Sequence, residues 1–234
     1  MALKKVVILG STGSIGTNTL QVLEDMQDQY EIYGLAANSS VEQLLAQAQT
    51  YHPAVLALTD EKAAKALRDC GRFQGKVLQG EQALVEICQD ADLVVLSVVG
   101  VAGLKPFVYC LEHGITVALA TKEAMVYGGR LARDLMDKTG TTVLPLDSEI
   151  SAIFQSLQGN KKEQIQEILL TASGGPFRTW PLEQVKTATL AQALKHPTGV
   201  WAQKSRSTVL LWRIKGWRSS KRAGCLISIR IRSP

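Results

Sequence analysis

The chain of 234 residues lacks any long hydrophobic run. Its apolar runs are short, as at residues 6–9, whereas a membrane-spanning helix needs about 20 consecutive apolar residues. The same run is too short for the hydrophobic region of a signal peptide, so we expect a buried strand there. The sequence therefore predicts no membrane segment and no targeting segment, and it indicates a cytoplasmic location.

Cysteine is scarce, and its spacing matches neither a disulfide framework nor a CxxC motif. The residues concerned are Cys70, Cys88, Cys110 and Cys225. We expect them to be small buried hydrophobic side chains in a reducing compartment. The remaining composition, with 46% hydrophobic and 20% charged residues, is typical of a globular protein of one or two domains.

Acidic residues are absent after Glu183. Residues 199–234 contain nine Lys or Arg and no Asp or Glu, which leaves 17 basic and 21 acidic residues before them and a net charge of −4 there. The overall charge of +5 and the pI near 9.0 therefore describe the basic tail and not the body of the chain. This change at Gly199 is the sharpest discontinuity in the sequence.

The first 147 residues alternate short apolar runs with helix-like segments, which is typical of an α/β fold with a parallel sheet and crossover helices. Strands are expected at residues 5–9, 31–36, 55–59, 93–98, 116–120 and 142–146. Helices are expected at residues 15–26, 41–50, 61–70, 81–89 and 104–113. Because the strands are apolar on both faces, we expect a Rossmann-like, doubly wound sheet that is covered on each side. The pattern leaves the strand order open.

The pattern changes after Asp147. A helix at 151–157, a polar turn at 161–163 and a strand at 165–171 precede a Gly-Gly-Pro break. These segments predict the opening of an incomplete α+β domain. We therefore expect a dinucleotide-binding domain over 1–147, the start of a catalytic domain over 148–198, and an aberrant, disordered basic tail over 199–234.

A strand, then glycines at positions 10, 13 and 16, then a helix is the context that a dinucleotide-binding loop requires. Glycines allow a tight turn and close approach of the backbone to a pyrophosphate, and the helix N-terminus supplies N–H groups for the phosphates. The hydroxyls of Thr12 and Ser14 add donors. A plain strand–helix turn is the alternative explanation of Gly10, Gly13 and Gly16.

The end of the second expected strand carries no carboxylate. A carboxylate there would accept hydrogen bonds from the ribose hydroxyls of NAD and repel a 2′-phosphate. Asn38, Ser39 and Ser40 can instead donate hydrogen bonds to a phosphate, which favours NADP. They can also form only a turn and a helix cap.

Two carboxylates, Asp147 and Glu149, flank Ser148 after an expected strand end, where ligands bind in open α/β sheets. Such hard oxygen ligands suit Mg²⁺ or Mn²⁺, although a helix cap explains the pair equally well. Lys122, with Glu123, can bring a cation to an anionic substrate. Ser173 in a Ser-Gly-Gly turn and His196 in a polar stretch are further candidates, and for His196 a surface role is the alternative.

Several long motifs occur in order along residues 4–198. They are Gly-Ser-Thr-Gly-Ser-Ile-Gly (10–16), Val-Val-Gly-Val-Ala-Gly-Leu (98–104), Ala-Thr-Lys-Glu (120–123), Leu-Asp-Ser-Glu (146–149), Ala-Ile-Phe-Gln-Ser-Leu (152–157), Thr-Ala-Ser-Gly-Gly-Pro-Phe-Arg (171–178) and His-Pro-Thr (196–198). In this series the chain resembles the 1-deoxy-D-xylulose 5-phosphate reductoisomerases. That family isomerises and reduces 1-deoxy-D-xylulose 5-phosphate to 2-C-methyl-D-erythritol 4-phosphate in the non-mevalonate isoprenoid pathway.

The resemblance implies an NADPH-dependent oxidoreductase that needs Mg²⁺, Mn²⁺ or Co²⁺ as a Lewis acid. It further implies a sugar phosphate substrate, no nucleic acid partner, and a location in the bacterial cytoplasm or, after processing, the plastid stroma. The family forms homodimers, and whether this chain forms one is left open. By motif, the NADPH contacts are Gly10, Thr12, Gly13, Ser14, Ile15, Asn38, Thr121 and Glu123. The metal ligands are Asp147 and Glu149, and the substrate and catalytic residues are Lys122, Asp147, Ser148, Glu149, Ser173 and His196.

The chain departs from the family pattern at three places. Asn38-Ser39-Ser40 replaces the usual Gly-Lys/Arg-Asn, so the usual cation near the 2′-phosphate is missing, and Thr121 replaces an Asn. After Thr198 the expected segment, which includes a third metal carboxylate, is absent. A shift of reading frame after Thr198 restores that segment, so we expect residues 199–234 to be an out-of-frame product and turnover by this chain to be very low.

Two alternatives remain at this stage. The tail, with Trp201, Trp212 and Trp217, is either a nucleic-acid- or membrane-binding extension or an unfolded one. The N-terminal strand, glycine loop and helix are also shared by other NADP-linked Rossmann enzymes, such as semialdehyde or homoserine dehydrogenases. Membership in those families would not explain the later motifs.

Overall fold

The computed structural model describes residues 2–171, 176, 177, 179–193, 230 and 231. The chain folds into two compact units, Met1–Asp147 (unit 1) and Ser148–Pro234 (unit 2). Among the described residues, no helix combines the length and the apolar character that crossing a membrane requires.

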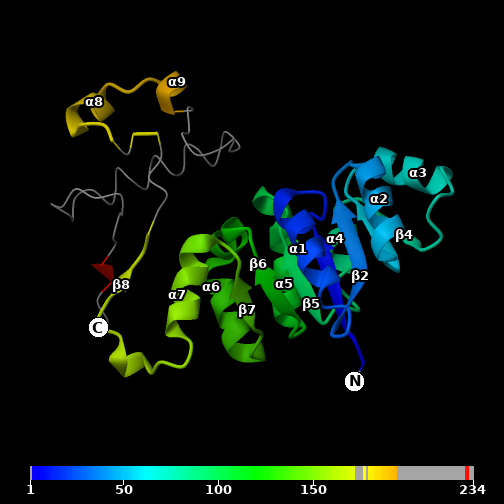
Figure 1. Ribbon diagram of the computed structural model, residues 1–234, viewed down its shortest axis with the longest axis horizontal. Helices are drawn as coiled ribbons and strands as arrows, with labels where there is room; N and C mark the ends of the chain where they lie inside the picture. Colours follow the sequence, from blue (N-terminus) through cyan, green and yellow to red (C-terminus); the bar gives the residue numbers. More distant parts are fainter. Residues whose placement is uncertain (1, 172–175, 178, 194–229, 232–234) are drawn as a thin grey trace. The chain divides into compact units, whose positions relative to one another are not determined.

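Unit 1 is built on one parallel sheet of seven strands in the order β4-β3-β2-β1-β5-β6-β7. Figure 1 shows β6 and β7 toward one end of this sheet and β2 and β4 toward the other. The strands are β1 (Lys4–Leu9), β2 (Tyr30–Ala37), β3 (Val55–Leu58), β4 (Lys76–Gln79), β5 (Leu93–Leu96), β6 (Thr116–Leu119) and β7 (Val143–Pro145). The chain winds outward from β1 to β4 and then returns to the other side of β1 with β5. This arrangement confirms the expected doubly wound α/β fold and supplies the strand order that the sequence left open.

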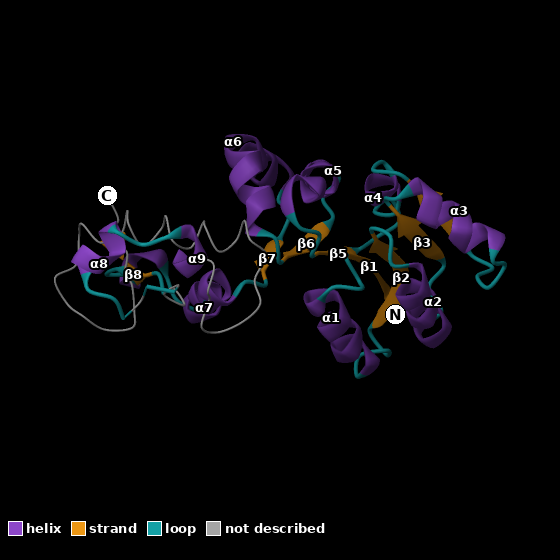
Figure 2. Ribbon diagram, turned by 90° about the horizontal axis from the view of Figure 1, so that it is seen from above, coloured by secondary structure: helices purple, strands orange, loops and turns teal. Residues whose placement is uncertain are grey.

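Helices cover both faces of this sheet. They are α1 (Ser14–Glu24), α2 (Val41–Tyr51), α3 (Glu61–Asp69), α4 (Ala83–Glu86), α5 (Leu104–Glu112) and α6 (Lys122–Thr139), and a 3₁₀ turn, η1 (Gly100–Gly103), precedes α5. Figure 2 shows α1 and α2 on one side of the sheet and α5 and α6 on the other.

Two hydrophobic clusters explain why the strands are apolar throughout. Successive side chains of β1 point to opposite faces, so Val7 and Leu9 join the cluster beneath α4, α5 and α6, whereas Val6 and Ile8 join the cluster beneath α1, α2 and α3. All four are fully buried. Burial on both faces is the condition under which a parallel sheet is stable, and it places β1 at the centre of the unit.

The sequence pattern did not predict two elements. Strand β4 lies at the edge of the sheet and buries only Leu78, so the strand lacks the run of apolar residues by which a buried strand is predicted. Helix α6 contains Gly128 and Gly129, and at Gly129 the backbone leaves helical geometry, with φ 47° and ψ −122°. A glycine pair with a kink weakens the helical period, which is the reason that no helix was expected there.

The expected burial of cysteine is right for two residues and wrong for one. Cys88 and Cys110 are fully buried, whereas Cys70 is exposed at the end of α3. A hydrogen bond with Cys110 and burial raise the pKa of the Cys88 thiol, so Cys88 remains a neutral core residue. Cys225 lies outside the described residues.

Unit 2 contains short elements. They are α7 (Ser148–Leu157), a 3₁₀ turn η2 (Lys162–Gln164), β8 (Ile168–Leu169), α8 (Leu182–Lys186), α9 (Leu190–Ala193) and β9 (Arg230–Ile231). Helix α7 begins earlier than expected and buries none of its residues, and β8 is shorter than the expected strand. Of the basic tail, the structure describes Arg230 and Ile231, which pair with β8 in antiparallel fashion.

The packing of α1 against the end of β1 predicts a steric requirement at Gly16. An added Cβ there would lie 2.3 Å from the Gly10 carbonyl oxygen and 2.5 Å from Ser11 Cα. We expect Gly16→Ala to lower the free energy of unfolding by about 2 kcal/mol or more, because backbone must move. Gly13→Ala is the matched control, since its Cβ would lie 3.4 Å from the same oxygen. Chemical denaturation that shows equal stability for both variants would contradict this packing.

A second prediction concerns Tyr51, whose hydroxyl donates a 2.5 Å hydrogen bond to Glu24 Oε1 and ties α2 to α1. This bond, with burial, raises the pKa of Tyr51 from 10.0 to about 12. The neutral phenol is the bonded form, so the bond stabilises the fold fully below pH 10, and this contribution is lost as pH rises through about 12.

The difference in phenolate absorbance between wild type and Tyr51→Phe measures this pKa. We expect a midpoint near 12 that falls toward 10 in Glu24→Gln, because the charged acceptor is gone. A midpoint that is the same in both backgrounds would show that Glu24 does not hold the phenol.

Candidate cofactor and substrate site

The carboxyl ends of the parallel strands meet at one edge of the sheet in unit 1. Gly10 follows β1, Asn38 follows β2, Ser97 follows β5, Thr121 closely follows β6 and Asp147 closely follows β7. Strand β1 lies between β2 and β5, so the chain departs in opposite directions on its two sides. Ligands of open α/β sheets bind at such a switch point.

The loop after β1 is fixed by short contacts. Gly10 has a φ of +90°, and a Cβ there would lie 2.9 Å from Ser97 Oγ. The Ser97 hydroxyl donates to the Leu9 carbonyl at 2.7 Å, and the Gly13 amide donates to the Gly10 carbonyl at 3.1 Å. The glycine at position 10 is therefore required both by its backbone conformation and by the approach of β5.

The N-terminus of α1 is open. Gly13 is its N-cap and supplies no side-chain cap, and Gly13, Ser14 and Ile15 are exposed. The amides of the first helical turn have no partner within the helix and point along its axis, so they suit an anion such as a phosphate. The hydroxyl of Thr17 donates back to the Gly13 and Ser14 carbonyls and does not block this end.

Helix α2 holds the same loop through two glutamines. The Ser11 hydroxyl donates to Gln47 Oε1 at 2.7 Å, and Gln47 Nε2 donates to the Ser11 carbonyl at 2.9 Å. Both residues are buried. Gln43 Nε2 also donates to the Thr12 carbonyl at 3.2 Å. Nothing in the sequence pattern singled out these glutamines, because they lie on a helix about 30 residues beyond the loop that they hold.

The turn after β2 is polar and exposed. Asn38 Oδ1 accepts a hydrogen bond from the Thr59 hydroxyl at 2.7 Å, which leaves the Asn38 amide nitrogen as a donor. Ser40 is the N-cap of α2, but its hydroxyl makes no capping hydrogen bond. A helix cap therefore does not account for Ser40, and the hydroxyl can donate to a ligand.

The segment after β6 carries three of the expected residues. Thr121, the N-cap of α6, is buried and donates its hydroxyl proton to the Val98 carbonyl at 2.6 Å. It can offer a ligand an acceptor lone pair but no proton. Lys122 is exposed and Glu123 is half-buried in the first turn of α6. An ammonium group at this edge can approach an anionic substrate.

Asp147 ends unit 1, and Ser148 and Glu149 begin α7 in unit 2. The Ser148 hydroxyl donates to Glu149 Oε2 at 3.0 Å. No set of three or more His, Cys, Asp or Glu side chains within the described ranges is placed to hold a metal ion. Ser173 and His196, the other expected substrate residues, lie outside the described residues.

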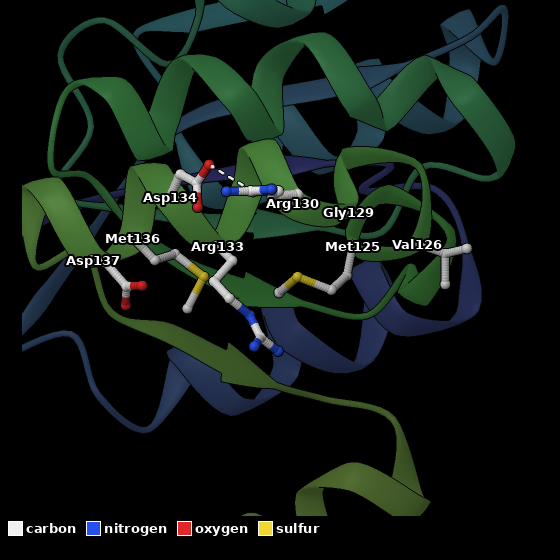
Figure 3. A pocket seen from close by; sticks show the side chains of 8 residues that line it. All are labelled: Met125, Val126, Gly129, Arg130, Arg133, Asp134, Met136 and Asp137. Atoms are coloured by element: carbon white, nitrogen blue, oxygen red, sulfur yellow. Dashed lines mark ion pairs between the residues drawn. The ribbon is translucent and has the colours of Figure 1, made fainter.

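A surface groove of about 920 Å³ runs along α6 (Figure 3). Met125, Arg133 and Met136 extend from one side of the helix, and Arg130 and Asp134 form an ion pair at 3.6 Å on another. None of the candidate residues lines this groove. Its lining carries no converging polar groups from a second element, so we place the candidate site at the sheet edge instead.

Comparison with known proteins gives the same assignment as the motifs. The family model described as 1-deoxy-D-xylulose 5-phosphate reductoisomerase matches residues 6–129, and the model of the C-terminal domain of that enzyme matches residues 143–209. A relative from Thermoanaerobacter pseudethanolicus with that name is 45% identical over 208 residues, covering 88% of this chain and 54% of the relative. One from Crocosphaera subtropica is 44% identical over 212 residues.

Solved structures agree. The reductoisomerase from Zymomonas mobilis in complex with NADPH has a TM-score of 0.81 at 35% identity, over 93% of this chain and 56% of that one. A structure of the enzyme with NADPH, fosmidomycin and magnesium has a TM-score of 0.76 at 32% identity, over 92% and 56%. The chain spans about half the length of the curated relatives that it matches. On these matches, the chain belongs to the 1-deoxy-D-xylulose 5-phosphate reductoisomerase family.

Proposed function

We propose that this chain carries the NADPH-binding part of a 1-deoxy-D-xylulose 5-phosphate reductoisomerase, together with the first substrate- and metal-binding residues. The reaction is the isomerisation and NADPH-dependent reduction of 1-deoxy-D-xylulose 5-phosphate to 2-C-methyl-D-erythritol 4-phosphate. The observation that carries the proposal is the open N-terminus of α1 behind a glycine loop at the switch point of the sheet.

The residues of this edge fit a dinucleotide. The first-turn amides of α1 suit the pyrophosphate, and the exposed Ser14 and the half-buried Thr12 supply hydroxyl donors beside them. Gly10 and Gly16 keep the backbone close to the sheet, where side chains would collide. When bound, NADPH supplies a hydride to the carbonyl of the rearranged substrate. Ile15, Asn38, Thr121 and Glu123 are the further cofactor contacts in this proposal.

The residues that we propose for the metal and the substrate supply only part of the ligands that these groups need. Asp147 and Glu149 supply two carboxylates for Mg²⁺, Mn²⁺ or Co²⁺, but a third ligand side chain is missing from the described residues. Lys122 and Ser148 offer a cation and a hydroxyl to the sugar phosphate, and Ser173 and His196 complete the proposed set. Since the metal ligand set is incomplete here, we derive no step that passes through the metal.

The compartment and the assembly also remain proposals. We expect a location in the bacterial cytoplasm or, after processing, the plastid stroma, and no nucleic acid partner, and the family's homodimer is the assembly to be tested for this chain. Sedimentation of the chain at several concentrations tests the dimer, and a single concentration-independent monomer would contradict it.

The first test of this function is NADPH binding to the 234-residue chain. We expect binding, seen as a change in nicotinamide fluorescence, that is unaffected by a metal chelator, because the loop of Gly10–Gly16 carries no carboxylate. Consumption of NADPH with 1-deoxy-D-xylulose 5-phosphate by this chain should instead be very low even with a divalent metal, because a third metal ligand is missing from the described residues. Absence of NADPH binding by a folded chain would refute the proposal.

The second test removes the hydrogen bonds between Gln47 of α2 and Ser11 of the loop. Gln47→Ala leaves the buried Ser11 hydroxyl and carbonyl without their partner, which costs about 1–3 kcal/mol. If the loop binds the cofactor, the Kd for NADPH rises about tenfold in a variant that still unfolds cooperatively. Gln21→Ala, at an exposed position on α1, is the control and should leave the Kd unchanged. An unchanged Kd in Gln47→Ala would place the cofactor elsewhere.

A further inference from the structure

The turn that should recognise the 2′-phosphate of NADPH contains no charged side chain. It consists of Asn38, Ser39 and Ser40, which are all exposed and offer neutral donors. A 2′-phosphate carries a charge near −2 at neutral pH. Hydroxyl and amide donors bind it more weakly than a guanidinium does, because charge-assisted hydrogen bonds are roughly twice as strong as neutral ones. A cation near this turn is therefore the missing element.

The first turn of α2 lies beside both the turn and the phosphate loop. Ser40 is the N-cap of α2, and Glu42 and Gln43 follow within its first turn. Gln43 donates to the Thr12 carbonyl, and Gln47, one turn later, is bonded to Ser11. Glu42 thus belongs to the same helical turn as Gln43, although its own side chain points to another part of the helix surface and is 79% exposed.

Arg72 forms an ion pair with Glu42. Its Nη1 donates to Glu42 Oε2 at 2.9 Å and to Oε1 at 3.2 Å. Arg72 follows Gly71, which has a φ of +64° and turns the chain between α3 and β4. Both bonds use the same nitrogen, so Nε and Nη2 of the guanidinium are left for another acceptor. The Arg72 side chain is 45% exposed, which gives a ligand access to it.

Asp60, a carboxylate near this turn, is already engaged. Asp60 accepts a hydrogen bond from the Ala63 amide at 2.8 Å as the N-cap of α3, and its own amide donates to the Asn38 carbonyl at 3.0 Å. Asp60 therefore stabilises α3 and does not compete for Arg72. Glu42 holds the guanidinium in place, which reduces the side-chain entropy that binding a phosphate would otherwise cost.

We propose that Arg72 recognises the 2′-phosphate of the cofactor and makes this site select NADPH over NADH. The role rests on the proposed function, because it requires that the Gly10–Gly16 loop bind a nicotinamide dinucleotide. Arg72 takes the place of a cation in the turn after β2 and reaches the phosphate from the α3–β4 connection. NADH carries a hydroxyl at the same position and gains nothing from the guanidinium.

The experiment measures the Kd of NADPH and of NADH for the full chain by nicotinamide fluorescence. We expect Arg72→Gln to raise the Kd of NADPH about tenfold and to leave that of NADH unchanged. Arg72→Lys keeps the charge and should retain most of the preference. Arg130→Gln removes another ion-paired arginine from the opposite side of the sheet and should change neither Kd.

An equal rise in the Kd of NADPH and of NADH in Arg72→Gln would mean a structural role and overturn the inference. An unchanged preference for NADPH would overturn it as well. A wild-type chain that binds NADPH and NADH equally would overturn it as well, while the proposed cofactor site would stand. A wild-type chain that is folded but binds neither cofactor would refute the proposed function itself.

Discussion

The end of β1 is the point on which the remaining structure depends. Here the chain must leave the centre of a sheet that is buried on both faces, turn within a few residues and start a helix. Glycine at positions 10 and 16 makes this turn possible, because a Cβ at either position would meet backbone or the Ser97 side chain within 3 Å. The buried pair of Ser11 and Gln47 then holds the turn against α2.

This constraint joins stability to function. The same close packing that fixes the loop leaves the first amides of α1 without a protein partner, since Gly13 provides no cap. Unpaired donors at the edge of a rigid sheet cost little because they face solvent, and they are already oriented for a phosphate. A side-chain cap would stabilise α1 by about 1 kcal/mol and would occupy the position that we propose for a phosphate.

The two units differ in how much of their structure is supported by burial. Unit 1 contains both hydrophobic clusters, whereas α7, which carries Ser148 and Glu149, buries none of its residues. The proposed cofactor loop lies in the unit that contains both clusters. The carboxylates at positions 147 and 149 lie where unit 1 ends and unit 2 begins, and the described residues do not complete a metal site around them. The proposed cofactor loop and the proposed metal ligands thus lie in parts of the chain that differ in burial.

The sequence by itself determined the fold class, the glycine loop and the family, because these depend on local patterns: apolar runs, the spacing of Gly10, Gly13 and Gly16, and ordered motifs. It also placed Asn38, Thr121 and Asp147 after strands. Only the tertiary structure decided the strand order, the edge strand β4, the kinked helix α6 and the exposure of Cys70. It also decided that Gln47 holds the loop and that Arg72 reaches α2. These depend on contacts between residues far apart in the chain, for which a local pattern carries no signal.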